Sequence, residues 1–311
     1  MPLRHRISFA MVGQRFELVD EAVENERKEL PWHDDVRFFY RFGRGHPVLN
    51  VLSTSPPASG GQGSRQERGL RREDLEPNQS IISQRKDPDQ YPEITYLGNQ
   101  YSKISLHREW NLGRFTPPRL PQRTDLPEDF LLEDASNLGL VLNNLEHRGV
   151  RSLLIGRLKE FCEAATDISA RIHGGTVQIF LHEEELQQPV PATRLSDGTL
   201  RYLCLLSILC HPEPPPLVCI EEPELGLHPD ILLTTAQLLV EASHRTQLIV
   251  TTHSDILIDA LTGTPEAIVV CEKEDASTRM HRLDGEALRE WLKTYSLGEL
   301  WRKGELGGNR W

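Results

Sequence analysis

The sequence predicts an α/β protein in which a parallel sheet with flanking helices follows an antiparallel, β-rich first part. From residue 191 onward, short apolar segments alternate with helical ones, which is typical of right-handed βαβ units. The run Leu217–Ile220 is apolar throughout and ends at a turn, as a strand buried on both faces does. Before residue 53, in contrast, short β segments flank glycine-containing turns, which is the pattern of hairpins.

The first predicted part, residues 1–135, is the antiparallel, β-rich portion of an N-terminal lobe. Within it, residues 53–76 are rich in Ser, Pro and Gly and then mix arginines with acidic residues, which predicts a mobile loop. Residues 111–129 are rich in proline and arginine and predict an ordered crossover. The other expected elements are β segments at 7–12, 16–19, 36–42 and 48–52, a helix at 88–102 and a strand at 103–110.

Residues 136–190 are predicted to form a helical and hairpin subdomain. Apolar residues at helical spacing predict helices at 136–147 and 150–165, and a hairpin is expected around Gly174-Gly175. The parallel-sheet core then covers residues 191–285. Its expected elements are helices at 199–210, 229–243 and 254–261 and strands at 217–220, 247–252 and 267–271.

The last predicted part, residues 286–311, is a helix at 286–295 followed by a tail. Its apolar side chains are most simply explained as a surface that docks on the rest of the chain. These side chains are Trp291, Leu292, Leu297, Leu300 and Trp301.

Composition excludes several classes of protein. The 311 residues are 38% hydrophobic and 26% charged, as in soluble globular proteins. No run approaches the ~20 apolar residues of a membrane span, and no signal peptide is visible, so we expect a cytoplasmic protein without a membrane partner. A net charge of −11 argues against a globally basic nucleic-acid surface. The cysteines lack metal-site spacing and are expected to be reduced core thiols: Cys162, Cys204, Cys210, Cys219 and Cys271.

Two adjacent carboxylates, Glu221 and Glu222, directly follow the strand at 217–220. In open α/β sheets, ligands bind at the carboxyl ends of the strands. One carboxylate there can hold Mg²⁺ while the next orients and deprotonates a water for phosphoryl transfer. His253 follows the next strand, so it is expected at the same edge, within reach of a γ-phosphate or an attacking water. The alternatives are an acidic surface turn and an ordinary loop histidine.

The segment Arg194-Leu-Ser-Asp-Gly198 opens the helix predicted at 199–210. Free backbone N–H groups, a serine hydroxyl and the positive end of the helix dipole together suit a γ-phosphate. The alternative for Ser196 is a plain N-cap. Each feature alone has an ordinary structural explanation. Their occurrence in this order, each at an element boundary, favours a nucleotide site.

These stretches resemble the signature motif, the Walker B motif with its D-loop, and the switch histidine of ABC-class ATPase heads, the class that includes the SMC, RecF and OLD ATPases. The segments 221–229 and 251–255 look like the RecF/OLD-like bacterial AAA ATPases in particular. The resemblance is strong over residues 191–255 and loose elsewhere. It implies a P-loop NTPase head of ABC type, with an N-terminal antiparallel β arm and a helical insertion, that binds ATP and Mg²⁺.

The same resemblance implies a role for each motif residue. Glu221 would be the Mg²⁺-side carboxylate, where many relatives have Asp; Glu222 would be the general base and His253 the γ-phosphate sensor. The signature stretch would bind the nucleotide of another head in a head-to-tail sandwich, so the implied partner is a second copy or another ATPase subunit. Its residues are Arg194, Ser196, Asp197 and Gly198, with Asp197 where transporters have Gly.

One motif of the class is missing from the sequence. A P-loop needs G-x-x-x-x-G-K-[ST], and the sequence contains no Gly-Lys dipeptide. The glycine-rich segment that begins at Gly60 has no lysine and follows no predicted strand. We therefore expect that the chain is truncated, and that a β–loop–α unit of at least ~30 residues, which carries the P-loop, is missing upstream. Gln84 and Gln122 are the candidates for the Q-loop glutamine of the class.

Two other functions remain open at this point. The chain could be a non-catalytic dimerisation module that supplies its signature motif to a partner ATPase. It could instead be a DNA-associated repair or defence effector, which only the arginines of residues 65–72 support. DNA repair, phage defence and transport regulation are all open as the process that ATP turnover would drive.

Overall fold

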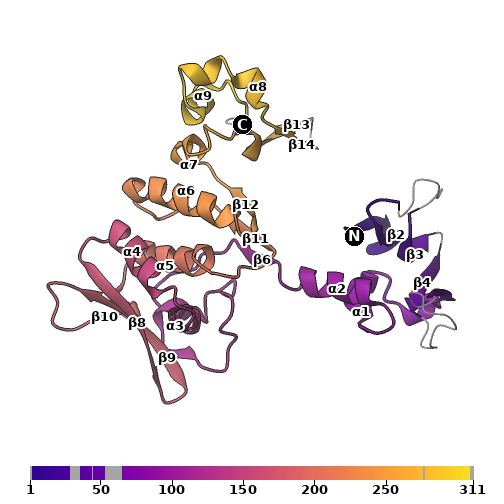
Figure 1. Ribbon diagram of the computed structural model, residues 1–311, viewed down its shortest axis with the longest axis horizontal. Coiled ribbons are helices and arrows are strands. Elements are labelled where there is room, and N and C mark those ends of the chain that lie inside the picture. Colours follow the sequence, from indigo (N-terminus) through magenta and orange to yellow (C-terminus); the bar gives the residue numbers. More distant parts are fainter. Residues whose placement is uncertain (1, 29–35, 44, 53–64, 276, 309–311) are drawn as a thin grey trace, which may run out of the picture. The chain divides into compact units, whose positions relative to one another are not determined.

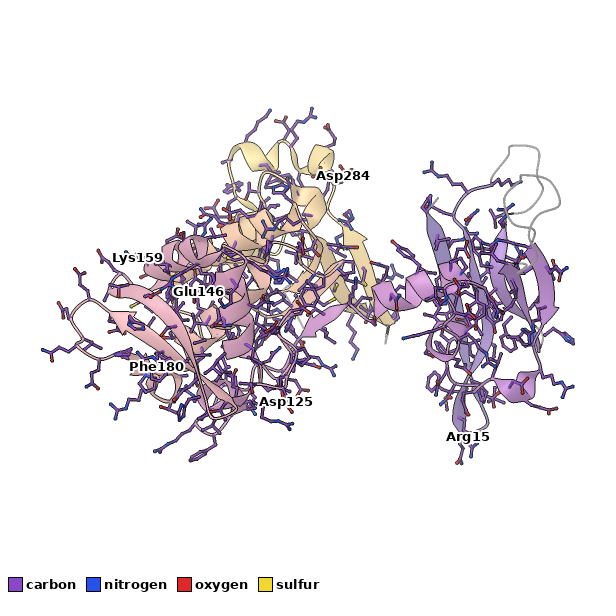
Figure 2. All side chains as sticks on the ribbon, turned by 60° about the horizontal axis from the view of Figure 1, so that its bottom comes forward. Arg15, Asp125, Glu146, Lys159, Phe180 and Asp284 are labelled. Atoms are coloured by element: carbon purple, nitrogen blue, oxygen red, sulfur yellow. The ribbon has the colours of Figure 1, made fainter. Side chains whose placement is uncertain are left out.

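The computed structural model describes residues 2–28, 36–43, 45–52, 65–275 and 277–308 (Figure 1). The chain forms two compact units, Met1–Lys103 and Ile104–Trp311, each with its own apolar core (Figure 2). The finer division into four parts stays a prediction. None of the helices in the described residues is long and apolar enough to span a bilayer.

The first unit is built on a five-stranded antiparallel sheet in the order β1-β2-β3-β4-β5. Both hairpins expected in the first 52 residues are confirmed, because β1 pairs with β2 and β3 with β4. The strands are β1 (Leu3–Val12), β2 (Arg15–Asn25), β3 (Phe38–Gly43), β4 (His46–Leu52) and β5 (Arg65–Gly69).

The strand β5 corrects the prediction of a loop over residues 53–76. Arg65 lies opposite Leu52 on β4, its guanidinium forms an ion pair with Glu93 at 2.5 Å, and it lies over the ring of Phe39. β5 pairs with the free edge of β4 and satisfies the backbone hydrogen bonds of that edge. Composition alone does not reveal such a pairing. Residues 53–64, with the glycine-rich segment from Gly60, lie outside the described residues.

The core of the first unit lies between its sheet and two short helices, α1 (Ile81–Gln84) and α2 (Pro92–Tyr101). Val23 and Tyr40 from the sheet and Ile94 from α2 are among its fully buried side chains. The helix expected at 88–102 is therefore confirmed, but it begins at Pro92, as a proline in the first turn permits.

The second unit contains a parallel sheet in the order β12-β11-β6, as Figure 1 shows. Its strands are β6 (Ser105–His107), β11 (Leu217–Glu221) and β12 (Gln247–Thr251). Ile220 lies in register with His107 and Val250, and these side chains belong to the covered face of the sheet. The helices α5 (Asp197–Leu209) and α6 (Pro229–Ser243) join the same apolar cluster, so the predicted α/β core is confirmed.

The helical insertion and its hairpin are confirmed as well. The helix expected at 150–165 ends early, at Phe161, because Ala165 already begins a strand. The hairpin belongs to a four-stranded antiparallel sheet. The elements of this region are η2 (Pro117–Arg119), β7 (Gln122–Arg123), α3 (Leu138–His147), α4 (Arg151–Phe161), β8 (Ala165–His173), β9 (Thr176–Glu183), β10 (Val190–Pro191) and η3 (Ala192–Arg194).

The strand expected at 267–271 does not extend the parallel sheet. It is β13 (Val269–Glu274), which pairs antiparallel with β14 (Ser277–Arg282). Every described side chain of β14 is exposed, so the strand carries no apolar pattern from which a sequence reading could find it. Cys271 lies on β13 and is exposed, which corrects its prediction as a core thiol, whereas Cys204 and Cys210 are buried.

The C-terminal residues fold against α7 (Asp255–Asp259). The single helix expected at 286–295 is replaced by α8 (Gly285–Leu288) and η5 (Trp291–Lys293), and the tail forms a further helix, α9 (Leu297–Lys303). A capping box at Ser296 starts α9. The predicted docked surface is confirmed for Leu292, Leu297, Leu300 and Trp301, but Trp291 is 47% exposed.

Candidate functional site

The predicted carboxylates lie at the carboxyl edge of the parallel sheet. Glu221 is the last residue of β11 and lies opposite Thr251, the last residue of β12. Glu222 follows with a φ of 43°, a left-handed conformation that is uncommon for any residue other than glycine. Its N–H donates to the carbonyl oxygen of Thr251 at 2.9 Å. The chain therefore turns sharply at Glu222, directly beside the end of β12.

The structure brings Glu222 and His253 together. His253 Nε2 lies 3.6 Å from Glu222 Oε1, and the imidazole is 79% exposed against 31% for the Glu222 side chain. The parallel register that places Glu221 beside Thr251 is the reason for this proximity. A carboxylate and an imidazole at such an edge can act together on one small group that approaches from solvent.

A third carboxylate, Glu224, was missed by the sequence reading. Its Oε1 accepts hydrogen bonds from Thr252 Oγ1 at 2.6 Å and from the backbone N–H of His253 at 2.8 Å. Its Oε2 is buried and has no hydrogen-bond partner among the described residues. The repeated acid in Glu-Glu-Pro-Glu was the signal available in the sequence.

Two further side chains hold the backbone of the glutamate pair. Trp110 Nε1 donates to the carbonyl oxygen of Glu221 at 3.0 Å, and Arg201 Nη1 donates to that of Glu222 at 3.2 Å. The Arg201 guanidinium also lies over the Trp110 ring, 5.1 Å from its centroid. Burial lowers the pKa of Arg201 from its usual value. No local sequence pattern marks either residue, because their acceptors are distant in the chain.

Ser196 caps the N-terminus of α5, as its simplest interpretation predicts. Its Oγ accepts from the N–H of Thr199 at 3.0 Å. Gly198 lies so close to the loop after β11 that an added Cβ would be 2.8 Å from the carbonyl oxygen of Gly226. The signature-like turn and the loop after Glu222 therefore touch through their backbones. Among the described residues, no direct hydrogen bond joins the Ser196 turn to Glu222 or His253.

Asp197 forms an ion pair with Arg119, which the sequence reading also missed. The Arg119 side chain is 7% exposed and that of Asp197 68%. Arg119 donates in addition to the carbonyl oxygens of Leu112, at 2.8 Å, and of Leu195. This buried arginine fixes the turn before α5 and balances the charge of Asp197. Arg194 is exposed at the end of η3.

An exposed carboxylate at this edge could contribute to a magnesium site. Within the described residues, no three or more His, Cys, Asp or Glu side chains come together as a metal site. Mg²⁺ is commonly bound by one or two carboxylates, with water and substrate phosphates completing its octahedron. The exposed Glu221 carboxylate beside Glu222 meets that requirement.

The amide groups of both Q-loop candidates are engaged in hydrogen bonds. Gln84 belongs to the first unit, where its Oε1 accepts from the N–H of Glu76 at 2.7 Å and its amide donates to the carbonyl oxygen of Gln79. Gln122 is buried, and its Oε1 accepts from the N–H of Gly139 at 2.7 Å. Both amides are used by their own surroundings.

One of the arginines of residues 65–72 is engaged within the first unit. Arg65 is engaged by Glu93 and by the carbonyl oxygen of Asn50. Arg68 and Arg71 are exposed, and the side chain of Arg72 lies outside the described residues.

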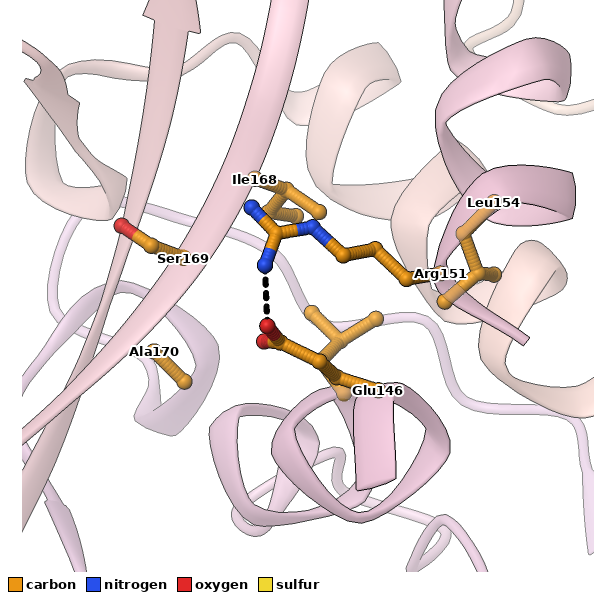
Figure 3. Close-up of a pocket in the computed structure, with 7 residues that line it drawn as sticks. Glu146, Arg151, Leu154, Ile168, Ser169 and Ala170 are labelled. Atoms are coloured by element: carbon orange, nitrogen blue, oxygen red, sulfur yellow. Dashed lines mark hydrogen bonds and ion pairs between the residues drawn. The ribbon is translucent and has the colours of Figure 1, made fainter. Parts of the chain in front are cut away.

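A small pocket lies elsewhere in the second unit, between α3, α4 and β8 (Figure 3). Arg151 crosses it and pairs with Glu146 and with Asp167. It has room for about one water molecule, about 10 Å³, and contains none of the predicted site residues. This pocket therefore does not mark the candidate functional site.

Sequence comparison identifies the family. The family model described as "AAA domain, putative AbiEii toxin, Type IV TA system" matches residues 8–259. The chain belongs to this AAA-domain family. Membership, together with the parallel sheet, confirms the predicted class of P-loop NTPase folds. No curated protein matches the sequence significantly.

Among solved structures, SMC heads are similar to the chain. The SMC head bound to the C-winged helix domain of ScpA is 14% identical over 86% of this chain and 75% of that one, with a TM-score of 0.48. The SMC head domain from Thermotoga maritima is 12% identical over 85% and 74%, with a TM-score of 0.35. The Smc head from Pyrococcus yayanosii, with its coiled coil and joint, is 16% identical over 52% of this chain, with a TM-score of 0.39; the chain spans 31% of that protein.

Proposed function

We propose that this AAA-family chain is an ATPase head that binds Mg·ATP and hydrolyses it to ADP and phosphate. The observation that carries the proposal is the pair of Glu222 and His253, 3.6 Å apart at the ends of adjacent parallel strands. Family membership supports nucleotide chemistry in general, and this pair supplies a carboxylate and an imidazole where that chemistry needs them.

In this proposal Glu222 is the general base. Its side chain is partly exposed, so a water can reach it, and its backbone is fixed by Arg201 and Thr251. His253 donates a hydrogen bond to the γ-phosphate oxygens or to the attacking water. A base and a donor fixed on adjacent strand ends need little reorganisation during the reaction.

Glu221 is proposed as the magnesium ligand. Bound there, Mg²⁺ would neutralise phosphate charge. Glu221 is suited to this role because its carboxylate is exposed at the strand end, while its carbonyl oxygen is held by Trp110. The carboxylate can therefore bind a cation without disturbing the strand.

The Ser196 turn is proposed to act on the nucleotide of a second head. Ser196 and Gly198 present a hydroxyl and backbone N–H groups at the start of a 13-residue helix. Asp197 would repel a phosphate, but Arg119 neutralises it. Arg194 is exposed beside the turn and adds positive charge. The proposed assembly is a head-to-tail homodimer or a pair with another ATPase subunit.

The proposal requires a phosphate-binding loop from outside these 311 residues, since they contain no Gly-Lys dipeptide. We propose that either an upstream segment or a partner chain supplies it. The intact mass of the protein from its native host distinguishes the two. A mass above 35.5 kDa favours the upstream segment, and a mass equal to it favours the partner.

Glu222→Gln is the decisive variant, made in the form isolated from the native host. We expect ATP binding to persist and phosphate release to fall by about 10²-fold or more, because the amide cannot take the proton of the water. Glu185→Gln, the same change at an exposed site, is the control and should leave turnover unchanged. Unchanged turnover in Glu222→Gln would refute the assignment.

The absent Gly-Lys dipeptide also favours a second candidate, a non-catalytic module. Such a module would offer its Ser196 turn to the nucleotide of another ATPase and hydrolyse nothing itself. If the native protein binds no ATP alone but raises the turnover of a partner ATPase, this second function holds instead.

A further inference from the structure

Glu224 accepts its hydrogen bonds from the turn that follows β12. Its Oε1 accepts from Thr252 Oγ1 and from the N–H of His253, at 2.6 and 2.8 Å. Hydrogen bonds to a carboxylate are stronger than those between neutral groups, and both lengths are in the range of such bonds. The other oxygen, Oε2, is buried and has no partner among the described residues. The carboxylate therefore faces the turn after β12.

The contact with Thr252 extends to the start of the next helix. The hydroxyl that donates to Glu224 also accepts from the N–H of Ser254 at 3.0 Å. Ser254 in turn caps α7, its Oγ accepting from Leu257 N. Hydrogen bonds therefore hold the hydroxyl of Thr252 and the backbone N–H groups of His253 and Ser254. The backbone of His253 is fixed in the middle of this arrangement.

The opposite end of the link is the glutamate turn itself. Glu224 follows Glu222 by two residues, and Glu222 Oε1 is the atom that lies 3.6 Å from His253 Nε2. The parallel register joins the strands up to Glu221 and Thr251, and the N–H of Glu222 adds one more bond to Thr251. After these strand ends, the described hydrogen bonds between the turn at Glu222 and the turn at His253 are the two that Glu224 accepts.

We propose that Glu224 is a positioning residue: it fixes His253 at its working distance from Glu222 by holding the backbone of the histidine. The effect on turnover rests on the ATPase function proposed above. The effect on the geometry of the turn does not depend on that function.

Amide exchange at His253, measured by NMR on the 311-residue chain, tests the geometry directly. In Glu224→Ala the N–H of His253 loses its acceptor, and its exchange should accelerate by about tenfold or more. Glu224→Gln keeps an oxygen acceptor and should stay within about threefold of the wild type. Unchanged exchange in Glu224→Ala, with the rest of the spectrum preserved, would overturn the proposal.

Thr252 provides a matched pair of variants that is independent of Glu224. Thr252→Ser keeps the hydroxyl and should preserve protection of the His253 amide, whereas Thr252→Val removes it and should reduce protection. Equal exchange in these two variants would contradict a role for the Thr252 bond. If Glu224→Ala fails to fold, this pair tests whether the contact between Glu224 and Thr252 protects the His253 amide, and equal exchange in the two variants then overturns the proposal.

Turnover adds a readout that a purely structural role would not change selectively. In the native form, Glu224→Ala should lower kcat by about tenfold while the affinity for Mg·ATP stays within about twofold, and Glu224→Gln should restore most of kcat. Equal losses in both variants would overturn the positioning role. A wild-type protein without turnover would refute the ATPase function, while amide exchange would still decide the position of His253.

Discussion

Acidification should destabilise the second unit through His107, which lies at the end of β6 beside the candidate site. The imidazole is 2% exposed. Its Nε2 is 2.6 Å from Ser105 Oγ, and its Nδ1 has no partner among the described residues. Burial lowers the pKa of His107 from 6.5 to about 4, against a smaller opposing effect of Glu133. The folded chain therefore keeps this imidazole neutral at pH values where the unfolded chain protonates it.

The sign and size of the effect follow from linkage. Between pH 6.5 and about 4, the unfolded state binds the proton that the folded state excludes, so the contribution of His107 to stability is lost as the pH falls through this window. A shift of this size corresponds to about 3 kcal/mol in full, and to about 2 kcal/mol between pH 7.5 and 5. Burial also lowers the pKa of His211, which adds a loss of the same sign.

Urea unfolding of wild type and His107→Gln at pH 7.5, 6 and 5 measures the contribution. Gln keeps a polar group within reach of Ser105 but does not titrate in this range. We expect the free energy of unfolding of the variant to fall by about 2 kcal/mol less than that of wild type between pH 7.5 and 5. His173→Gln, at an exposed position, should follow the wild type. Parallel curves for wild type and His107→Gln would refute the reasoning.

Two other predictions concern packing. Gly198→Ala should destabilise the chain by about 1–3 kcal/mol, because its Cβ would meet the carbonyl oxygen of Gly226 at 2.8 Å. Gly156→Ala, inside α4 with open space around it, should instead stabilise the chain by about 0.5–1 kcal/mol. Thermal unfolding that ranks the two variants in the opposite order would contradict this prediction. When the native chain is labelled with a thiol reagent at pH 8 and examined by mass spectrometry, the exposed Cys271 should react first. Burial raises the pKa of Cys204 to about 12 and that of Cys210 to about 11, and it protects both thiols. Reaction of Cys204 as fast as that of Cys271 would show the core to be open.

The sequence predicted best the elements whose signals are local. The helix α6 has the bounds expected for it, because a His-Pro turn precedes it and an apolar stripe runs through it. The strand β11 was recognisable from its continuous apolar run. The strands β5 and β14 were missed because their residues are mostly polar and exposed, and only pairing with a neighbour makes them strands.

The residues of the candidate site also include some that the sequence could predict and some that it could not. The proximity of Glu222 and His253 could be predicted, because two consecutive parallel strands end at one edge of the sheet. Arg119 and Trp110 could not, because their partners Asp197 and Glu221 lie 78 and 111 residues away in sequence. Nothing in their own neighbourhoods distinguishes them from other arginines and aromatic residues. The supporting side chains of the site thus depend on the fold being known.

The loop after β11 carries a strained conformation that the structure stabilises from several directions. A φ of 43° at Glu222 is unfavourable for a side-chain-bearing residue, by an amount on the order of 1–2 kcal/mol. Arg201 holds the carbonyl oxygen of Glu222, and Thr251 binds its N–H. These two hydrogen bonds hold the backbone of Glu222 in this conformation. The conformation is explained if the direction of the Glu222 side chain is what matters, since that direction places its carboxylate beside His253.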